Sequence, residues 1–405
     1  MFVLTNNKTT FLTLLIDAMY LRGVEFNTLN DDKLNTIENE KLSAAEVNMG
    51  SVFIGEVESD FNLEMDKKFI DFLKKNKFKR AVVAVPDSKK FNIEYLLNGS
   101  ITVAHIPSLD VETGILREFY IQAFLELVLK DIPNLPCASK ISTQLNSLIK
   151  KIAGTSATVL VNGPSGTGKE LISNLIHYFS DRKEKALVAV NCAAIPEQML
   201  ESILFGHEKG AFTGAVQPNE GLVRAAHGGT ILLDEISEMS LPLQSKLLRV
   251  IQEKKVMPIG SSVETEVEVR ILATTNRNMF AAVKAGHFRE DLFYRLNVFP
   301  INSTSLKDRP DDVVPIVAHM LIKVFEEQGR LIGITEESLL RLKEYDWPGN
   351  VRELSNIIQR AGILCDNNLI EEKDLFFDSE AHFGHPNTAE VLAAKFNSTN
   401  KSEVA

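Results

Sequence analysis

The sequence predicts an α/β protein with at least two parallel-sheet domains, and three observations support that prediction. A chain of 405 residues is too long for one ordinary hydrophobic core, so we expect two or three domains. Over residues 1–130, short apolar runs alternate with amphipathic stretches, which is typical of a parallel sheet with helices on both faces. At 159–170, an apolar run ends in a glycine-rich loop that opens a helical pattern, as in units that hold phosphate.

The composition excludes several classes of protein. With 44% hydrophobic and 24% charged residues, the chain has the balance of an ordinary soluble globular protein. A net charge of -10 argues against a protein that mainly coats nucleic acid. Cys137, Cys192 and Cys365 are far apart, so neither a disulfide framework nor a zinc site is supported, and a reducing cytoplasm fits. The apolar segment 11–21 contains Asp17 and follows no basic stretch, so we expect neither a signal peptide nor a membrane span.

Residues 1–130 are expected to form a regulatory α/β domain. Apolar runs predict buried strands at 2–4, 24–26, 52–54, 81–85 and 101–104. Amphipathic patterns predict helices at 9–22, 66–76 and 116–129. This alternation resembles a response-regulator receiver domain, and the resemblance implies a doubly wound sheet.

The receiver resemblance covers the architecture and not the chemistry. Receiver domains carry an acidic pair after the first strand, a phosphoacceptor aspartate after the third and a lysine after the fifth. Here those places read Thr5-Asn6-Asn7, Gly55-Glu56 and Ile106-Pro107-Ser108. Without clustered carboxylates we expect neither a Mg²⁺ site nor a phosphoacceptor. The domain is therefore similar to the atypical receivers of flagellar-type master regulators, and the prolines of 131–136 then mark a linker.

The glycine-rich loop has the Gly-x4-Gly-Lys spacing of a P-loop. Its glycines let the backbone turn tightly and present N–H groups inward, the next helix adds its positive end, and Lys169 can reach the terminal phosphates. Glu170 stands where a Ser or Thr normally offers Mg²⁺ a hydroxyl. The plainer alternative is a strand-to-helix turn without a ligand. The candidate nucleotide-binding residues are Gly163, Pro164, Ser165, Gly166, Thr167, Gly168, Lys169 and Glu170.

Two later apolar runs deliver polar residues to the same edge of the predicted second sheet. Asp234 and Glu235 follow the run 231–233, where Asp234 is placed to hold Mg²⁺ and Glu235 to orient and deprotonate water. The run 269–276 ends in Thr275 and Asn276, which can hydrogen-bond a γ-phosphate or the attacking water. The plainer alternative is that these residues only terminate their strands.

A segment between the glycine-rich loop and these two runs carries the signature that identifies a family. Residues 210–215 read Gly-Ala-Phe-Thr-Gly-Ala, the GAFTGA signature of bacterial sigma-54-dependent transcription activators, which the chain resembles over 138–375. Physically, Phe and Thr bracketed by small residues make a poor core element and a good mobile contact. A hairpin tip is the plainer alternative. The resemblance implies that the sigma-54 contact is made by Gly210, Ala211, Phe212, Thr213, Gly214 and Ala215.

The resemblance also assigns roles around the nucleotide. Asn191 matches the family's switch asparagine, which contacts the catalytic glutamate, here Glu235. Arg352 opens the predicted lid helix and matches the sensor-II arginine that faces nucleotide.

Further arginines match the fingers by which one subunit enters its neighbour's site. Arg289 and Arg295 match both finger positions, whereas Lys307 stands where the family has an arginine, and lysine lacks the planar fork. As a plainer alternative, Arg289, Arg295 and Arg352 could form ion pairs with Glu or Asp on surface helices.

The resemblance implies an AAA+ P-loop ATPase core at 131–305, an α-helical lid at 306–377 and a short tail at 378–405, after the receiver-like domain at 1–130. It implies ATP and Mg²⁺ as cofactors. It also implies a homo-oligomeric ring, taken as a hexamer, that remodels the sigma-54 RNA polymerase holoenzyme in the cytoplasm without a membrane contact. The alternatives are a nucleotide-binding regulatory protein that acts by partner binding without turnover, and a general protein-remodelling AAA+ module, which the GAFTGA loop disfavours.

Specific DNA binding is not expected from the tail. Family members usually end in a helix-turn-helix with basic residues aimed at the groove. Residues 378–405 hold one short helical pattern and only Lys395 and Lys401 as basic side chains, too few for the phosphate contacts that affinity requires. A basic run at 74–80 is the alternative source of DNA contacts.

Overall fold

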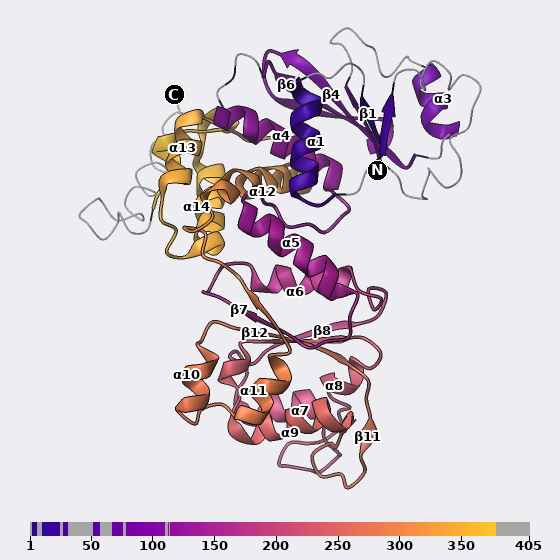
Figure 1. Ribbon diagram of the computed structural model, residues 1–405, viewed down its shortest axis with the longest axis vertical. Helices are drawn as coiled ribbons and strands as arrows, with labels where there is room; N and C mark the ends of the chain where they lie inside the picture. Colours follow the sequence, from indigo (N-terminus) through magenta and orange to yellow (C-terminus); the bar gives the residue numbers. More distant parts are fainter. Residues whose placement is uncertain are drawn as a thin grey trace, which may run out of the picture.

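The computed structural model describes residues 2–5, 10–24, 27–30, 52–56, 67–75, 78–109, 112 and 114–377 (Figure 1). An N-terminal sheet and a C-terminal group of helices lie side by side above a second, central sheet. The expectation about DNA contacts from 378–405 concerns a segment outside the described residues. No helix in the described ranges is long and apolar enough to cross a membrane.

The N-terminal sheet has the strand order β2-β1-β3-β4-β6-β5. Its strands are β1 (Phe2–Thr5), β2 (Asn27–Asn30), β3 (Val52–Glu56), β4 (Arg80–Ser88), β5 (Asn92–Leu96) and β6 (Ile101–Pro107). Its helices are α1 (Thr10–Leu21), α3 (Lys67–Lys75) and α4 (Gly114–Leu129). The parallel strands follow a doubly wound order. The receiver resemblance itself stays a prediction.

Two expectations for this sheet were wrong. The second strand begins at Asn27, whereas 24–26 was predicted, and Val24 lies in no strand. The unpredicted β5 pairs antiparallel with β6, so the sheet is mixed and not purely parallel. An antiparallel edge strand needs only a short connection, here the turn at 97–100, and its polar and apolar residues mix because one face is exposed.

The central sheet is wholly parallel, in the order β13-β7-β12-β9-β8. Its strands are β7 (Val159–Asn162), β8 (Leu187–Asn191), β9 (Thr230–Asp234), β12 (Arg270–Thr275) and β13 (Phe299–Asn302). The helices around it are α5 (Lys140–Ala153), α6 (Lys169–Tyr178), α7 (Glu197–Phe205), α8 (Leu222–Ala225), α9 (Leu241–Glu253), α10 (Met279–Lys284) and α11 (Glu290–Leu296). A small hairpin of β10 (Lys255–Val256) and β11 (Thr265–Glu266) extends from α9.

The C-terminal helices form a lid. It consists of α12 (Val313–Gln328), α13 (Glu336–Glu344), α14 (Asn350–Leu364) and the strand pair β14 (Gly333–Ile334) with β15 (Leu369–Ile370). Trp347 is 1% exposed at its centre, and its indole N–H donates to the Leu342 carbonyl at 2.9 Å, so the polar edge of a buried ring is satisfied.

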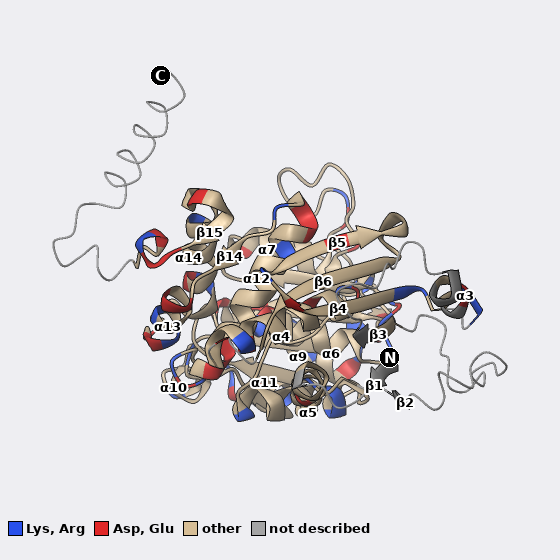
Figure 2. Ribbon diagram, turned by 90° about the horizontal axis from the view of Figure 1, so that it is seen from above, with Lys and Arg blue, Asp and Glu red and all other residues tan. Residues whose placement is uncertain are grey.

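The N-terminal domain and the lid share one hydrophobic core. The buried faces of α1 and α4 form a continuous cluster with the buried faces of α12, α13 and α14. Figure 2 shows β6 and most of β4 in tan, without charged residues. On the same side, Tyr95 of β5 stacks on Phe325 of α12, with ring centroids 5.6 Å apart. Because the apolar faces are buried together, we expect the two units to unfold together.

A buried ion pair lies inside this shared core. Arg22, 2% exposed, pairs with Glu126 of α4, and the other carboxylate oxygen of Glu126 lies 2.7 Å from Nδ1 of His319 on α12. Asn146 of α5 donates to the Arg22 carbonyl at 2.6 Å. Burial raises the pKa of Glu126, but the charges of Arg22 and His319 outweigh it and hold that pKa below the usual range. One side-chain cluster therefore joins the N-terminal domain, α5 and the lid.

We predict that Glu126→Leu lowers the free energy of unfolding by about 3 kcal/mol, because it leaves Arg22 buried without a counter-charge. Thermal or urea unfolding of the full chain measures this. Since the folded-state pKa of Glu126 is depressed, its contribution is present above the usual carboxylate pKa and is lost as pH falls through the folded value. The control is Glu327→Leu, on the exposed side of α12. Equal stability of both variants would contradict the stabilising role of this buried ion pair.

Candidate active site

The glycine-rich loop connects β7 to α6 at the carboxyl edge of the central sheet. Two glycines are required there by close contacts. A Cβ on Gly163 would lie 2.3 Å from the Ser303 carbonyl oxygen, and one on Gly166, where φ is +77°, would lie 2.5 Å from the Gly349 carbonyl oxygen. The loop is thus enclosed by the segment after β13 on one side and by the lid on the other.

Lys169 begins α6 and turns back over the loop. Its side chain is 7% exposed, and Nζ donates to the carbonyls of Gly163 at 3.0 Å and Pro164 at 3.1 Å. Nζ also lies 3.7 Å from the Glu235 carboxylate, so the ammonium group is already at the point where loop and acid converge. Glu170, in contrast, lies exposed in the first turn of α6.

The two acids leave β9 in different directions. Asp234 accepts hydrogen bonds on one oxygen from Thr274 Oγ1 and on the other from Asn191 Nδ2, at 2.9 Å. Glu235 has a left-handed backbone, with φ of +52°, and its carboxylate accepts the Asn276 N–H at 3.0 Å. That turn swings Glu235 toward Lys169, while Asp234 stays between β8 and β12.

The positions of Asn191 and Thr275 differ from the expected ones. Asn191 contacts Asp234 and not Glu235, because β8 and β9 are in register with these two residues side by side. Thr275 is fully buried and donates to Ser237 Oγ at 3.0 Å, so its hydroxyl faces away from the site. Successive residues of a strand point to opposite faces, which is why Thr275 and its neighbour differ.

Thr274 is one of the site residues that sequence reasoning missed. Its hydroxyl donates to Asp234 and accepts the Glu235 N–H at 3.1 Å, so one side chain orients both acids. Strand alternation was the available signal, because Thr274 and not Thr275 shares the face of the acids. Asn276, also predicted, acts through its backbone N–H on Glu235.

A buried thiol lies beside these acids. Burial raises the pKa of Cys192 to about 12, and the nearby Asp234 and Glu235 add to the rise. The thiol is therefore protonated at neutral pH, which argues against a nucleophilic cysteine.

The lid contributes three side chains near the loop. Arg352 of α14 donates to Ser165 Oγ at 2.7 Å, and Asn350 donates to the Ser165 carbonyl at 3.1 Å. Arg309, 4% exposed, donates to the Thr167 carbonyl at 2.9 Å. Lys307 instead points outward and pairs with Asp346 at 2.7 Å, so it contacts no part of the loop.

The two finger candidates lie on the surface of the central domain. Arg289 is held by Asp291 at 2.7 Å and by Ser245 Oγ at 3.1 Å, and the hydrogen bond to Asp291 raises the pKa of Arg289. Arg295 is exposed and has no ion pair with any residue that the structure describes. Neither arginine contacts Lys169 of its own chain.

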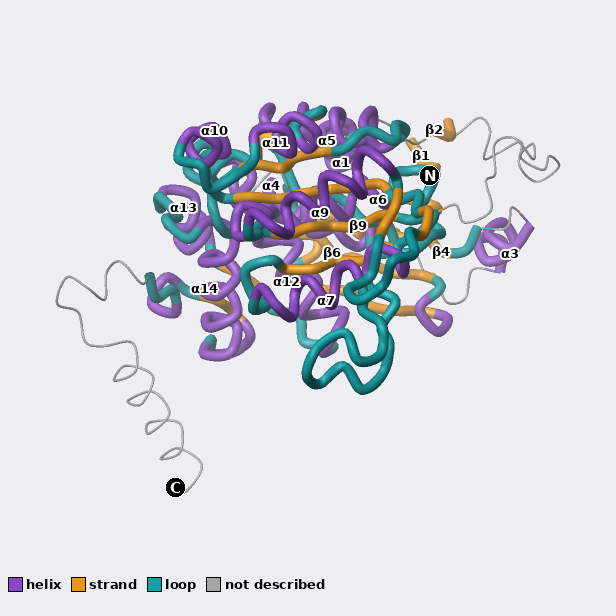
Figure 3. The backbone as a smooth tube through the Cα atoms, turned by 90° about the horizontal axis from the view of Figure 1, so that it is seen from below, coloured by secondary structure: helices purple, strands orange, loops and turns teal. Residues whose placement is uncertain are grey.

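The signature loop follows α7 and projects from the central domain among the teal segments near α7 (Figure 3). Its base is closed by the Gly210 N–H, which donates to the Ala215 carbonyl at 2.8 Å. Phe212 is 45% exposed and packs edge-on against His207, with ring centroids 4.9 Å apart. The apolar side chain is thus held ready at the surface, and Thr213 is exposed beside it.

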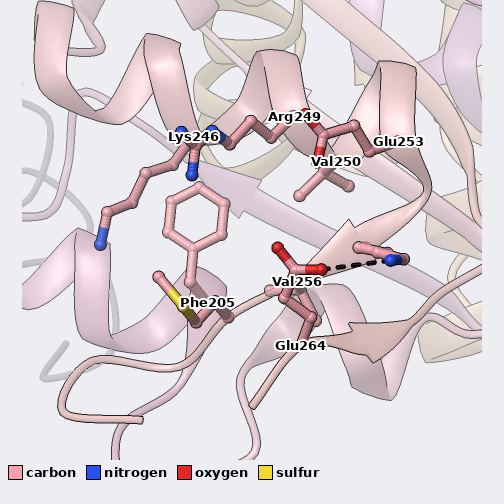
Figure 4. Close-up of a pocket in the computed structure, with 9 residues that line it drawn as sticks. Phe205, Lys246, Arg249, Val250, Glu253, Val256 and Glu264 are labelled. Atoms are coloured by element: carbon pink, nitrogen blue, oxygen red, sulfur yellow. Dashed lines mark hydrogen bonds and ion pairs between the residues drawn. The ribbon is translucent and has the colours of Figure 1, made fainter. Parts of the chain in front are cut away.

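The stem of this loop is anchored beneath α9. Phe205, the last residue of α7, is 1% exposed and lines a pocket with Lys246, Arg249 and Val250 of α9 (Figure 4). Across the pocket, Lys255 pairs with Glu264 at 3.2 Å. α7 thus leads directly into the stem of the signature loop.

The parallel sheet, phosphate loop, paired acids and helical lid together define an AAA+ P-loop ATPase. Comparison with known proteins shows which domain families these regions match. Residues 135–302 match the sigma-54 interaction domain, and residues 307–390 match the AAA+ ATPase lid domain. These matches place a sigma-54 interaction domain, followed by an AAA+ ATPase lid domain, in this chain.

Several characterised proteins are similar to the chain over this region. The response regulator FleR of Pseudomonas aeruginosa is 50% identical over 235 residues, covering 58% of this chain and 50% of FleR. The Nif-specific regulatory protein of Klebsiella pneumoniae is 45% identical over 247 residues, covering 61% of this chain and 47% of its own length. The chain thus spans about half the length of these curated relatives. Crystalline NtrX from Brucella abortus in complex with ADP is similar with a TM-score of 0.57 and 25% identity, covering 93% of this chain and 85% of NtrX.

We predict that Thr274→Val lowers ATP turnover by about 10–100-fold, because both acids lose the hydroxyl that orients them. Steady-state phosphate release measures this, with nucleotide affinity determined separately. Thr275→Val is the matched comparison and should reduce turnover less, since that hydroxyl faces Ser237. The reverse order of effects would contradict the assignment.

Proposed function

We propose that the chain is a ring-forming ATPase that uses ATP hydrolysis to activate transcription by the sigma-54 RNA polymerase. One observation carries the proposal: the nucleotide site and the GAFTGA loop are joined by a single short helix, α7. The matches to the sigma-54 interaction domain and its lid support it.

The site residues fit a magnesium nucleotide. The loop presents backbone N–H groups, and Lys169 supplies positive charge for terminal phosphates. Asp234 would hold Mg²⁺, which neutralises charge on phosphate oxygens when bound. Among the described residues no cluster of three or more metal-ligating side chains exists, as fits an ion held mainly by phosphate and water.

The remaining site residues have separate roles in ATP hydrolysis. Glu235 orients and deprotonates water. Its carboxylate is held in place by the Asn276 N–H and lies close to Lys169. Arg289 and Arg295 act on the site of a neighbouring subunit, because both are on the surface and away from their own loop. A ring, taken as a hexamer, is then required for activity.

Asn191 is the proposed link to the signature loop. Its Nδ2 donates to Asp234, and its Oδ1 accepts the N–H groups of Ala193 at 2.9 Å and Ala194 at 3.2 Å, in the turn that enters α7. A change in the hydrogen bonding of Asp234 during turnover thus shifts this turn. Through α7 it then raises or lowers Phe212 and Thr213, which grip sigma-54.

The proposal is tested with purified protein, sigma-54 holoenzyme and a sigma-54 promoter. We expect ATP to drive conversion of the closed to the open promoter complex, detected by permanganate reactivity of the melted strand. Thr213→Ala should keep ATP turnover and lose opening, because the loop acts by contact and lies away from the phosphates. The control is Ser261→Ala, in the adjacent loop. Opening by Thr213→Ala at the unsubstituted rate would contradict the role of the loop, and no opening with active ATPase would contradict the function.

A further inference from the structure

Two alternate carbonyls of the phosphate loop are held by buried lid side chains. Asn350 Nδ2 donates to the Ser165 carbonyl at 3.1 Å, and Arg309 Nη2 donates to the Thr167 carbonyl at 2.9 Å. Both side chains belong to residues that are 4% exposed. These contacts are made from outside the loop, on its lid side, and so they leave its inner face free.

Through the geometry of the peptide bond, these contacts also fix the direction of the neighbouring N–H groups. In a planar trans peptide, the carbonyl of one residue and the N–H of the next point in opposite directions. Holding the carbonyls of Ser165 and Thr167 toward the lid therefore aims the N–H groups of Gly166 and Gly168 away from it. Neither of these two N–H groups has an acceptor among the described residues, as expected of donors reserved for an anion.

We propose that Asn350 and Arg309 are positioning residues that aim the Gly166 and Gly168 amides at the phosphates of a nucleoside di- or triphosphate. Nucleotide affinity then depends on lid closure, because both donors move with the lid. This inference rests on the proposed nucleotide-dependent function and deepens it.

Each donor is itself fixed by a second contact. Asn350 Oδ1 accepts the Leu306 N–H at 2.8 Å, which ties the start of α14 to the chain entering the lid. Arg309 Nη1 lies 3.5 Å from Asp312 and 3.3 Å from Ser142 Oγ. Since these partners restrict the two donors, the cradle is organised before a ligand arrives.

Asp312 extends the same support to α5. Its fully buried carboxylate accepts the N–H groups of Ala138 at 2.8 Å and Ser139 at 2.7 Å. The start of α5, the phosphate loop and the lid thus meet at one buried ion pair. Breaking this ion pair would disturb all three segments. The test must therefore distinguish a change in the orientation of the loop amides from a loss of folding stability.

The test measures the affinity of the full chain for a fluorescent ADP analogue, which binds without turnover. Asn350→Asp keeps an acceptor for the Leu306 N–H, but it exchanges the donor to Ser165 for a negatively charged oxygen. Arg309→Met removes the shorter of two donors to the Thr167 carbonyl and leaves Ser303 Oγ at 3.3 Å. We expect each to raise the Kd about tenfold, the loss of one oriented hydrogen bond to a charged ligand site. At saturating ATP, turnover should largely recover, because bound phosphate re-aims the amides, so KM rises while kcat changes little.

Arg270→Met is the matched control. Arg270 is 2% exposed and donates to the carbonyls of Ile152 and Ala153, each at 2.9 Å, at the far end of α5 from the loop. It should lose stability without losing ADP affinity. Unchanged ADP affinity in both Asn350→Asp and Arg309→Met overturns the inference and leaves the proposed function intact. Failure of the unsubstituted chain to bind the ADP analogue contradicts both.

Discussion

The direction of a few backbone N–H groups is the constraint on which the rest of this structure depends. An amide can face a phosphate only if the carbonyl of the same peptide finds a partner on the other side. Here those partners are supplied by the lid and by the segment after β13, and they approach so closely that Gly163 and Gly166 have no room for a side chain. The glycine spacing, the lid and the buried Arg309–Asp312 pair are consequences of one geometric requirement.

The position of the N-terminal domain follows from the same lid. Because α4 and α12 share a core and Glu126 joins Arg22 to His319, a displacement of the lid strains the N-terminal domain as well. Lys150 of α5 also donates to the Gly23 carbonyl, which ties the end of α1 to the helix that precedes the phosphate loop. A ligand or partner that favours one arrangement of the N-terminal domain would thereby bias the lid.

Sequence reasoning succeeded where local pattern decides structure. The strand, loop and helix of the phosphate site, the acids after β9 and the signature at 210–215 all carry their information within a few residues. It failed where a long-range register decides. Asn191 contacts Asp234 because β8 and β9 are in register at this pair. Thr274, and not Thr275, contacts the acids because its side chain lies on the face of β12 that they share. Arg309 and Asn350 were invisible as site residues, since their carbonyl partners lie far away in the chain.

In the proposed ring, one catalytic site is divided between two chains, with the acids on one and the arginines on the next. Mixing two inactive variants tests this division most directly. Glu235→Gln chains keep their arginines, and chains with Arg289→Ala and Arg295→Ala keep their acids. The account predicts that each variant alone lacks ATP turnover and that the mixture regains it as protein concentration rises. A mixture that stays inactive at every concentration, or turnover by the double arginine variant alone, would contradict it.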